Sequence, residues 1–465
     1  MGGIVKSVRA IRRGVLAALA TVALGAVGPS CASAQEPDTV EALSRLVVFA
    51  DGEEIDRGLT GLRLRGKPDA AAALILALRY NRIAERRISA TLAALTGHRD
   101  AQDWFDWMVW QEAHPEIAPH PSFRRLKLDM LTRIDIEFSR FFGGNPRFDI
   151  RLEEIVWGGV PVDGIPALVE PAMIPAGQAD YLTADDPVFG VEIAGDARAY
   201  PLRILDWHEM ANDTVGGVPV ALAYCTLCGA GILFDRRATG RAKPFEFGSS
   251  GLLYRSNKLM YDRETDSLWN QFTGRPVVGK LAGSGIELKQ LPVTIASWRR
   301  WRERHPDTKV LAPDTGHIRD YTTGAAYGRY FESPKLMFPA GLADGRLAAK
   351  DQVFGVRAPA GAKAWPLEAF RATPVINDRV GAVDVLVIGN AAERTGRAYR
   401  RDGREFQATQ DPAVLRGPGG AWRVTEEALL GPDGARLPRV AGHVAYWFAW
   451  ASYLGPKPEL YQPAR

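Results

Sequence analysis

The most reactive feature of the sequence is a Cys-x-x-Cys-Gly motif in the segment 224–229, which reads Tyr-Cys-Thr-Leu-Cys-Gly. An alternating apolar run ends at Cys225, and a second apolar run, 232–234, follows the motif. Where two strands meet, the two thiolates converge, and Gly229 allows a turn whose backbone N–H groups point at sulfur. The spacing therefore predicts a metal knuckle formed by Cys225 and Cys228.

Other uses of the same cysteine pair are weighed against metal binding. Covalent haem attachment is disfavoured because Gly229 stands where a histidine is required. A thioredoxin-type active site opens a helix, whereas this sequence continues as a strand, which disfavours that architecture too. Two alternatives stay open: thiol–disulfide exchange by Cys225 and Cys228 without metal, and a short-loop disulfide that only staples a hairpin in a non-catalytic scaffold.

A knuckle supplies two metal ligands, and the chain has no second close cysteine pair that would complete a four-thiolate zinc site. The remaining ligands must then be histidine, carboxylate, methionine or water. His208, in the run Asp-Trp-His-Glu at 206–209, is the predicted third ligand. A set of two cysteines and one histidine with an open position suits one transition-metal ion, zinc or copper, and metal-assisted chemistry.

Polar residues near the motif in sequence supply further candidates for this site. Carboxylates such as Asp262 and Glu264 act as general bases or ligands when the fold brings them near cysteine sulfurs. Turn formation explains the acidic run 262–266 equally well. Glycine-rich phosphate loops and dinucleotide fingerprints are absent, so no nucleotide cofactor is expected. The candidates near the site are Glu209, Tyr254, Asp262 and Glu264.

An internal repeat organises the second part of the chain. Residues 188–225 align without gaps on residues 353–390 with 14 of 38 positions identical, which indicates two copies of one module. The alternation of Val218, Val220 and Leu222 has the period of a half-buried strand. Each copy acts as a control for the other: shared positions are explained by the fold, and differing positions are candidates for function.

The reactive side chains differ between the two copies. Cys225 faces Asn390, Cys228 faces Glu393, and the residue opposite His208 is a threonine. We therefore expect the first module to carry the chemistry and the second to be structural.

Each module ends with two tryptophans three residues apart. In the first module they belong to the basic run 298–304, which predicts a short amphipathic helix with Trp298 and Trp301 inward and its arginines in solvent. In the second module the pair is Trp447 and Trp450.

The composition and periodicity predict an α+β fold. Helical spacing dominates from about residue 39 to 142, where short helices in series resemble HEAT-type repeats. Short β-type runs with Gly, Pro and Asp between them follow to the end of the chain. The expected domains are a helical domain at 35–145, a first β-rich module at 146–335 and a second, degenerate module at 336–465.

The first 34 residues have the order of a secretory signal peptide. Four basic residues and no acid precede the apolar run 14–27, and small residues end the segment at Ala34. The pair Arg12-Arg13 leaves both a Sec and a twin-arginine signal open, and lipid attachment at Cys31 is disfavoured because no bulky aliphatic residue precedes it. We expect cleavage after Ala34 and a periplasmic or extracellular protein.

The net charge of +4 is explained by that segment, since the rest of the chain has 54 basic and 54 acidic residues. A neutral exported chain is not expected to bind nucleic acid. Later in the sequence no apolar stretch approaches the roughly 18 residues of a membrane span, so no transmembrane segment is expected in the mature chain. The expected partner is a protein or a small molecule.

These motifs resemble the domain-of-unknown-function 3179 family of exported bacterial proteins over about residues 150–460. The resemblance implies a Cys-x-x-Cys-Gly module without an established activity, so it leaves open whether the protein is an enzyme. One departure is Thr226, at a position where the family often has proline, which stiffens the knuckle. The resemblance is carried by the segments 158–168, 186–213, 224–229, 251–254, 261–265 and 305–308 and by Trp269.

Overall fold

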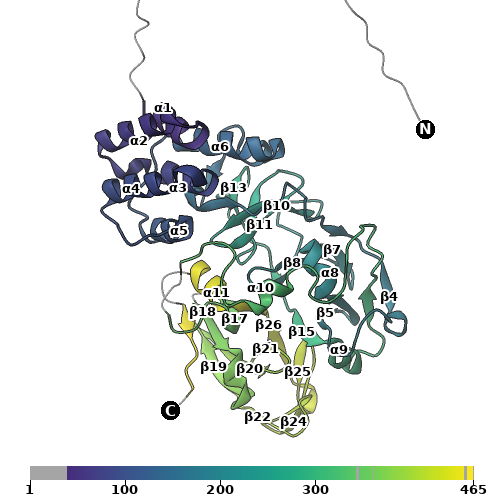
Figure 1. The fold of residues 1–465 in the computed structure, drawn as a ribbon. Coiled ribbons are helices and arrows are strands. Elements are labelled where there is room, and N and C mark those ends of the chain that lie inside the picture. Colours follow the sequence, from purple (N-terminus) through teal and green to yellow (C-terminus); the bar gives the residue numbers. More distant parts are fainter. Residues whose placement is uncertain (1–38, 342–344, 360, 455–457, 464–465) are drawn as a thin grey trace, which may run out of the picture. The chain divides into compact units, whose positions relative to one another are not determined.

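The computed structural model describes residues 39–341, 345–359, 361–454 and 458–463. The predicted signal peptide therefore lies outside the described residues. Helices precede most of the strands, and the α+β fold class is confirmed (Figure 1). Between residues 40 and 142 the chain forms α1 (Val40–Phe49), α2 (Glu53–Arg65), α3 (Ala71–Tyr80), α4 (Glu85–Thr96), α5 (Trp104–Ala113), α6 (Phe123–Ile134) and α7 (Ser139–Phe142).

Local signals explain where these helices end. Gly66 and Gly97 adopt left-handed backbone conformations directly after α2 and α4, a conformation that glycine takes without steric cost. Trp107 and Trp110 are buried on α5. The helical part joins the β-rich body through one continuous apolar cluster that includes Leu74, Trp107, Cys228 and Trp450.

The first module contains three sheets. The strand orders are β1-β13-β12-β11-β10-β2, β14-β9-β8-β7-β3 and β15-β5-β6-β16-β4. The strands are β1 (Arg147–Phe148), β2 (Ile155–Trp157), β3 (Leu168–Val169), β4 (Met173–Pro175), β5 (Pro187–Ile193), β6 (Asp196–Pro201), β7 (Met210–Val215), β8 (Val218–Cys225), β9 (Ala230–Asp235), β10 (Phe247–Tyr254), β11 (Asn257–Asp262), β12 (Leu268–Asn270), β13 (Arg275–Gly279), β14 (Gln290–Leu291), β15 (Thr294–Ser297) and β16 (Lys309–Leu311). The helices are α8 (Leu202–His208) and α9 (Trp298–Arg304), and α10 (Gly328–Glu332) follows.

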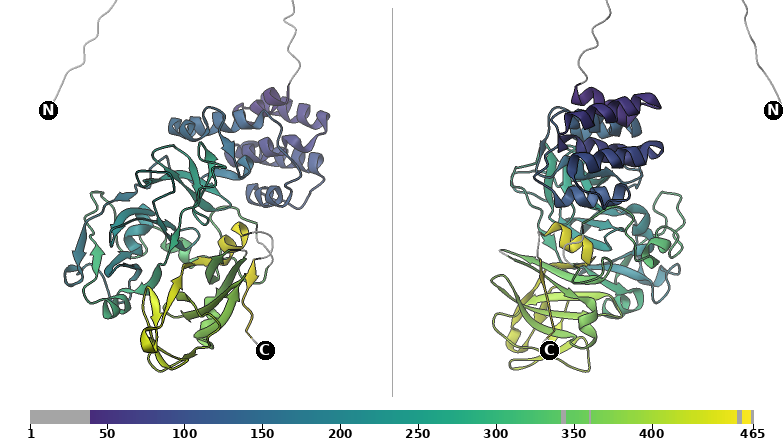
Figure 2. Two further views of the ribbon diagram at one scale, coloured as in Figure 1. Left: turned by 180° about the vertical axis from the view of Figure 1, so that it is seen from behind. Right: turned by 60° about the vertical axis from the view of Figure 1, so that its left-hand side comes forward.

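The second module has sheets of order β27-β17-β18-β28 and β19-β20-β21-β26-β25-β24-β23-β22. Figure 2 shows its green and yellow strands from two further sides. The elements are β17 (Gln352–Ala358), β18 (Gly361–Pro366), β19 (Val375–Val380), β20 (Val383–Asn390), β21 (Thr395–Arg400), β22 (Gln407–Ala408), β23 (Val414–Gly417), β24 (Gly420–Val424), β25 (Ala428–Leu430), β26 (Arg436–Val440), β27 (Gly442–Tyr446), α11 (Trp447–Tyr453) and β28 (Glu459–Leu460). Short 3₁₀ turns complete the described chain: η1 (Pro68–Ala70), η2 (Arg82–Ala84), η3 (Ile136–Phe138), η4 (Leu152–Glu154), η5 (Ala176–Gln178), η6 (Leu367–Arg371) and η7 (Pro432–Gly434).

The two modules share their strand arrangement. The run β14-β9-β8-β7 corresponds to β26-β21-β20-β19, and β15-β5-β6-β16 corresponds to β27-β17-β18-β28. Their packing also corresponds: a Cβ atom on Gly190 would lie 2.2 Å from the Trp301 ring, and one on Gly355 would lie 2.1 Å from the Trp450 ring. In each copy a glycine thus lets a tryptophan of the closing helix lie directly on the sheet.

The sequence expectation of a half-buried strand at 218–222 is wrong for β8. From Val220 to Cys225 every residue of β8 is buried. Ala221 and Ala223 belong to one apolar cluster and Val220 and Leu222 to another, so both faces of the strand are covered. The alternation in the sequence separates two cores, not a core from solvent.

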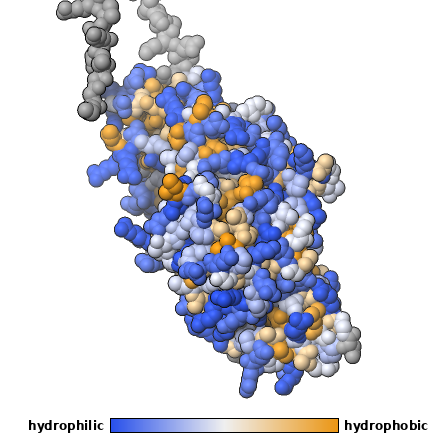
Figure 3. Space-filling view, turned by 90° about the vertical axis from the view of Figure 1, so that its right-hand side faces the viewer, coloured by the Kyte–Doolittle hydropathy of each residue, from blue (hydrophilic) through white to orange (hydrophobic). Residues whose placement is uncertain are grey.

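The surface shown in Figure 3 is mostly hydrophilic, with apolar side chains scattered over it. Among the described residues, no helix has the length and apolar character needed to cross a membrane.

Acidification is expected to destabilise the protein through His443. This side chain is buried between Phe272 and Trp450, and burial, assisted by the charge of Arg357, lowers its pKa to about 3. Between about pH 6.5 and 3 His443 is protonated in the unfolded chain and neutral in the folded chain. The free energy of unfolding therefore falls by about 1.4 kcal/mol for each unit by which the pH is lowered in this range.

Denaturant titrations of His443→Phe across this pH window measure the effect. The variant keeps an aromatic ring, and its free energy of unfolding should depend less steeply on pH than that of the wild type. An unchanged slope in His443→Phe would contradict the assignment.

Candidate functional site

The cysteine pair lies in the tight turn between β8 and β9. The turn closes through the Cys228 N–H, which donates to the Cys225 carbonyl at 3.2 Å, and the Gly229 N–H, which donates to the Thr226 carbonyl at 3.2 Å. Gly229 has a φ of 58°, the left-handed conformation that the motif's glycine predicted. Both cysteines are free thiols and buried, and their sulfurs are 2.8 Å apart.

The separation of the two sulfurs can be compared with the two products they could form. A disulfide bond is about 2.05 Å long. Two thiolates on one tetrahedral zinc ion, each with a bond of about 2.3 Å, are about 3.8 Å apart. At 2.8 Å the sulfurs are closer to the disulfide distance, so oxidation requires a movement of under about 1 Å.

A buried ion pair lies beside the cysteines. Lys258, on β11, donates from Nζ to the Glu209 carbonyl at 2.8 Å and lies 3.5 Å from the Glu209 carboxylate. The other Glu209 oxygen accepts the Thr226 hydroxyl at 2.9 Å. Glu209 ends α8 in a left-handed conformation, with a φ of 52°, and all three side chains are buried. The Cys-x-x-Cys turn is therefore tied to a charged pair through the residue that follows Cys225.

These charges act on the cysteine pair in opposite directions. Burial, the contact with Cys225 and the charge of Glu209 raise the pKa of the Cys228 thiol well above its ordinary value, and Lys258 opposes this. Burial lowers the pKa of Lys258. Burial also raises the pKa of Asp206 to about 7. The Tyr224 hydroxyl opposes this shift, and the charge of Glu209 adds to it. Burial thus favours the protonated form of the Cys228 thiol.

Tyrosine side chains and backbone cover the turn. The Tyr330 hydroxyl, from α10, donates to the Leu227 carbonyl at 2.6 Å. The Tyr446 N–H, from the second module, donates to the Cys228 carbonyl at 2.8 Å. A Cβ atom on Gly229 would lie 3.1 Å from the Tyr446 ring, so this glycine is also needed for the close contact between modules.

A cavity of about 500 Å³ has one lining side chain, Tyr327, that interacts with the Cys-x-x-Cys turn. Asp206 and Trp207 also line it, and the partner of Tyr327 in the turn is Thr226. Tyr327 is therefore the side chain through which this cavity meets the Cys-x-x-Cys turn.

His208 uses both ring nitrogens away from the sulfurs. Nδ1 is 2.8 Å from the Pro166 carbonyl, and Nε2 is 2.5 Å from the Tyr321 hydroxyl. Burial, together with nearby positive charge that includes Arg319, lowers the pKa of His208 to about 4. The imidazole is therefore neutral and engaged in two hydrogen bonds, neither of them to Cys225 or Cys228.

The other sequence candidates occupy separate places. Asp262 accepts hydrogen bonds from the Thr265 backbone and hydroxyl and from the Trp269 indole, so it orders the turn after β11. Glu264 is exposed and accepts from the Glu246 N–H at 3.2 Å. Tyr254 is buried, and its carbonyl accepts the Tyr453 hydroxyl. Of the four, Glu209 is the one with a side-chain hydrogen bond to the Cys-x-x-Cys turn in the described structure.

Sequence reasoning missed the side chain that bears the positive charge at this site. Lys258 lies in a polar run, 256–258, that is notable only for its position between apolar residues. Lysine is seldom buried, so a lysine directly before the apolar residues 259–261 was the feature of the sequence that could have identified it. Across the described ranges, no three His, Cys, Asp or Glu side chains are grouped so as to hold a metal ion.

Residues 162–458 match the model of one protein family, described as protein of unknown function (DUF3179). No curated protein and no solved structure matches the chain.

Proposed function

Because the chain belongs to the domain-of-unknown-function 3179 family, whose description assigns no activity, we propose from the site itself that the protein is a thiol–disulfide redox protein that uses Cys225 and Cys228. The observation that carries this proposal is the 2.8 Å contact between the two thiols in a closed turn. Such a pair changes between dithiol and disulfide with little movement of the backbone.

The proposed reaction is a two-electron exchange with a disulfide of a partner protein or a small molecule. One thiol loses its proton and attacks a sulfur of the partner disulfide, which releases one partner thiolate. The second thiol then loses its proton and attacks the mixed disulfide, which forms the Cys225–Cys228 bond and releases the second partner thiolate. The two protons lost by the cysteines balance those taken up by the partner.

The neighbouring charged groups support the proton transfers. Lys258 favours a thiolate at Cys228, which counters part of the effect of burial. Asp206, with a pKa raised to about 7 by burial, is a group that can accept a proton near neutral pH. Since both thiols are buried, the exchange also requires the cover around Tyr327 and Tyr330 to move.

Redox equilibration of the purified protein tests the proposal. After incubation in glutathione buffers of graded potential, thiol titration of the denatured protein should show both thiols lost together, with a midpoint between about −270 and −120 mV. Mass spectrometry should show the loss of two hydrogen atoms. A midpoint below about −300 mV would indicate a structural disulfide instead.

Elemental analysis of the same sample addresses the metal site predicted from the sequence. Two thiolates present a partial zinc or copper site, and further ligands would have to come from water or a partner. One equivalent of zinc or copper that protects both thiols from titration would support metal binding and would contradict the redox proposal.

The proposed location is the periplasm or the extracellular space, with a signal peptide at residues 1–34. Mass spectrometry of the protein recovered from its host should find Gln35 as the first residue. A mature protein that retains residues 1–34 would contradict the proposed cleavage, and a diacylglyceryl group on Cys31 would indicate a lipoprotein.

A further inference from the structure

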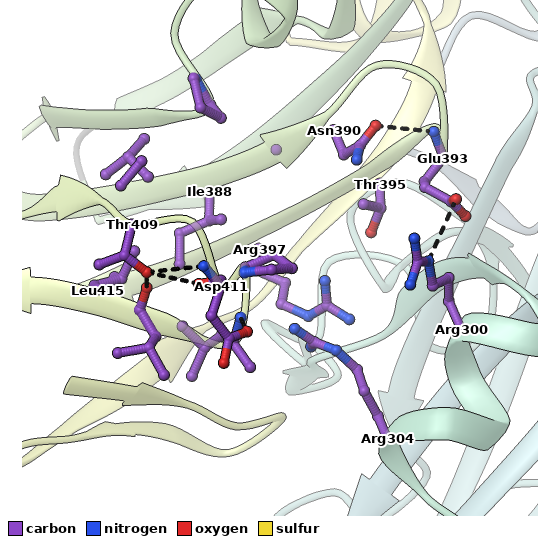
Figure 4. A pocket seen from close by; sticks show the side chains of 18 of the residues that line it. Arg300, Arg304, Ile388, Asn390, Glu393, Thr395, Arg397, Thr409, Asp411 and Leu415 are labelled. Carbon is purple, nitrogen blue, oxygen red and sulfur yellow. Dashed lines mark hydrogen bonds and ion pairs between the residues drawn. The ribbon is translucent and has the colours of Figure 1, made fainter. Parts of the chain in front are cut away.

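A cavity of about 520 Å³ lies where α9 of the first module meets β20 and β21 of the second (Figure 4). Apolar side chains such as Ile388 and Leu415 form part of its wall. The rest of the wall is polar, and the side chains of Arg304 and Arg397 extend toward each other in it (Figure 4). Cavities of this size, with mostly apolar walls and a few placed polar groups, are typical of small-molecule sites.

This cavity occupies the position in the second module that the dithiol occupies in the first. Asn390 and Glu393, which line it, are the counterparts of Cys225 and Cys228 in the repeat. Each turn also meets the closing helix of the other module: β20–β21 meets α9, and β8–β9 meets the strand end that leads into α11, through the Tyr446 N–H. The two sites are related by the duplication.

A difference in strand length explains why only the second position is open. In each copy an asparagine side chain pairs with a phenylalanine backbone, Asn212 with Phe247 and Asn377 with Phe406, so β10 corresponds to β22. In the first module β10 has eight residues and leads to a turn whose Ser256 carbonyl is 3.5 Å from the Cys228 sulfur. In the second module β22 has two residues, and the segment after it lines the cavity instead of filling it.

The buried cluster of charged side chains beside the cavity has more positive than negative groups. Glu426 is nearly fully buried and accepts hydrogen bonds from Arg397 at 2.7 Å, from Arg304 at 3.4 Å and from Arg439. One carboxylate therefore faces three guanidinium groups. Arg304 has the longest of these contacts, and its pKa is lowered by burial and by the like charge of Arg397.

The carboxylates that line the cavity have their own partners. Glu303 lies 3.0 Å and Glu393 3.8 Å from the guanidinium of Arg300. Asp411 is exposed and accepts the Ala413 N–H at 2.8 Å. The positive charge of Arg304 and Arg397 is therefore the charge that a ligand would meet.

Thr395 adds a donor to the same wall. Its side chain is over nine-tenths buried, and among the described residues its hydroxyl has no hydrogen-bond partner. A buried hydroxyl without a partner costs free energy, which a ligand atom can recover by accepting its hydrogen bond.

We propose that this cavity binds a small organic carboxylate with an apolar body. Arg304 and Arg397 hold the carboxylate by charge-assisted hydrogen bonds, and the Thr395 hydroxyl donates to the same group. The apolar body lies against Ile388 and Leu415. An inorganic anion would leave this apolar wall unfilled, and the proposal does not depend on the redox chemistry of the cysteines.

Calorimetric titration of the full mature chain with octanoate and with benzoate tests the site. Saturable binding of at least one of them to one site is expected, and octylamine and inorganic phosphate should bind more weakly by on the order of tenfold or more. Equal binding of octylamine, or no saturable binding of either carboxylate, would overturn the proposal.

Matched variants locate the site. Arg304→Gln should weaken the binding of the carboxylate on the order of tenfold, whereas Arg302→Gln, on the exposed side of the same helix, should not change it. Thr395→Val should weaken binding while leaving the unliganded protein as stable as the wild type or more stable, because it removes an unsatisfied hydroxyl. Wild-type affinity in both Arg304→Gln and Thr395→Val would overturn the assignment.

Discussion

Replacing Cys228 by alanine is expected to abolish the formation of the internal disulfide. Cys225 alone can still form a mixed disulfide with glutathione, but the thiol that would release it is absent, so the mixed disulfide should accumulate in oxidising buffer. Mass spectrometry of the intact variant, with and without dithiothreitol, measures this product. The free energy of unfolding of the reduced variant should fall by only about 1 kcal/mol, because a single small buried side chain is truncated.

A reduced rate of disulfide exchange in a second variant distinguishes a redox site from a structural disulfide. Lys258→Met keeps an unbranched buried side chain that is one atom shorter and removes the charge that favours a Cys228 thiolate, so the rate of exchange with a small disulfide should fall by on the order of tenfold. Since Lys258 also binds the Glu209 carbonyl, the fold is checked by circular dichroism. The exposed Lys280→Met is the control. Wild-type exchange rates in Lys258→Met, or the absence of an accumulated mixed disulfide in Cys228→Ala, would contradict the proposed reaction.

The largest loss of stability is expected from Glu426→Gln. The substitution leaves the buried guanidiniums of Arg397 and Arg439 without the carboxylate that both contact. Breaking a buried ion pair by removing one partner costs about 3–5 kcal/mol, because the remaining charge stays buried and unpaired. Urea denaturation at neutral pH measures the change in the free energy of unfolding.

The neighbouring residue supplies the control. Glu427 contacts Arg436 at the surface, and Glu427→Gln should change the free energy of unfolding by no more than about 1 kcal/mol.

The pH dependence of the free energy of unfolding is a second test of Glu426. The arginines hold the pKa of Glu426 well below its usual range, so its stabilisation is present above the unfolded pKa, near 4.5, and is lost as pH falls through the folded value. Glu426→Gln should lack this loss, and equal effects of the two variants would show that Glu426 is not the centre of the cluster.

The sequence by itself determined the local structure and the repeat. Helix ends at Gly66 and Gly97 follow from glycine's access to left-handed backbone, and the alternating run before Cys225 is a strand because side chains alternate in that conformation. The aligned positions of the two copies share their strand order because the same residues make the same contacts. The Gly190 and Trp301 pair, repeated as Gly355 and Trp450, is one such contact.

Only the tertiary structure decided what surrounds the reactive residues. His208 was expected beside the sulfurs, but which partners a buried ring meets depends on segments more than 100 residues away, here the loop that carries Tyr321. Lys258 and Glu209 meet across 49 positions of sequence for the same reason. Spacing along the chain does not encode such distances.

The second module was expected to be structural because its copy of the motif has no cysteine. The structure places Asn390 and Glu393 at a cavity, because the short β22 does not fill the space that β10 and its turn fill in the first module. The residue types at the two turns were readable from the sequence. Whether the space beside each turn is filled depends on strands that pair far along the chain, and only the folded arrangement of both modules determines it.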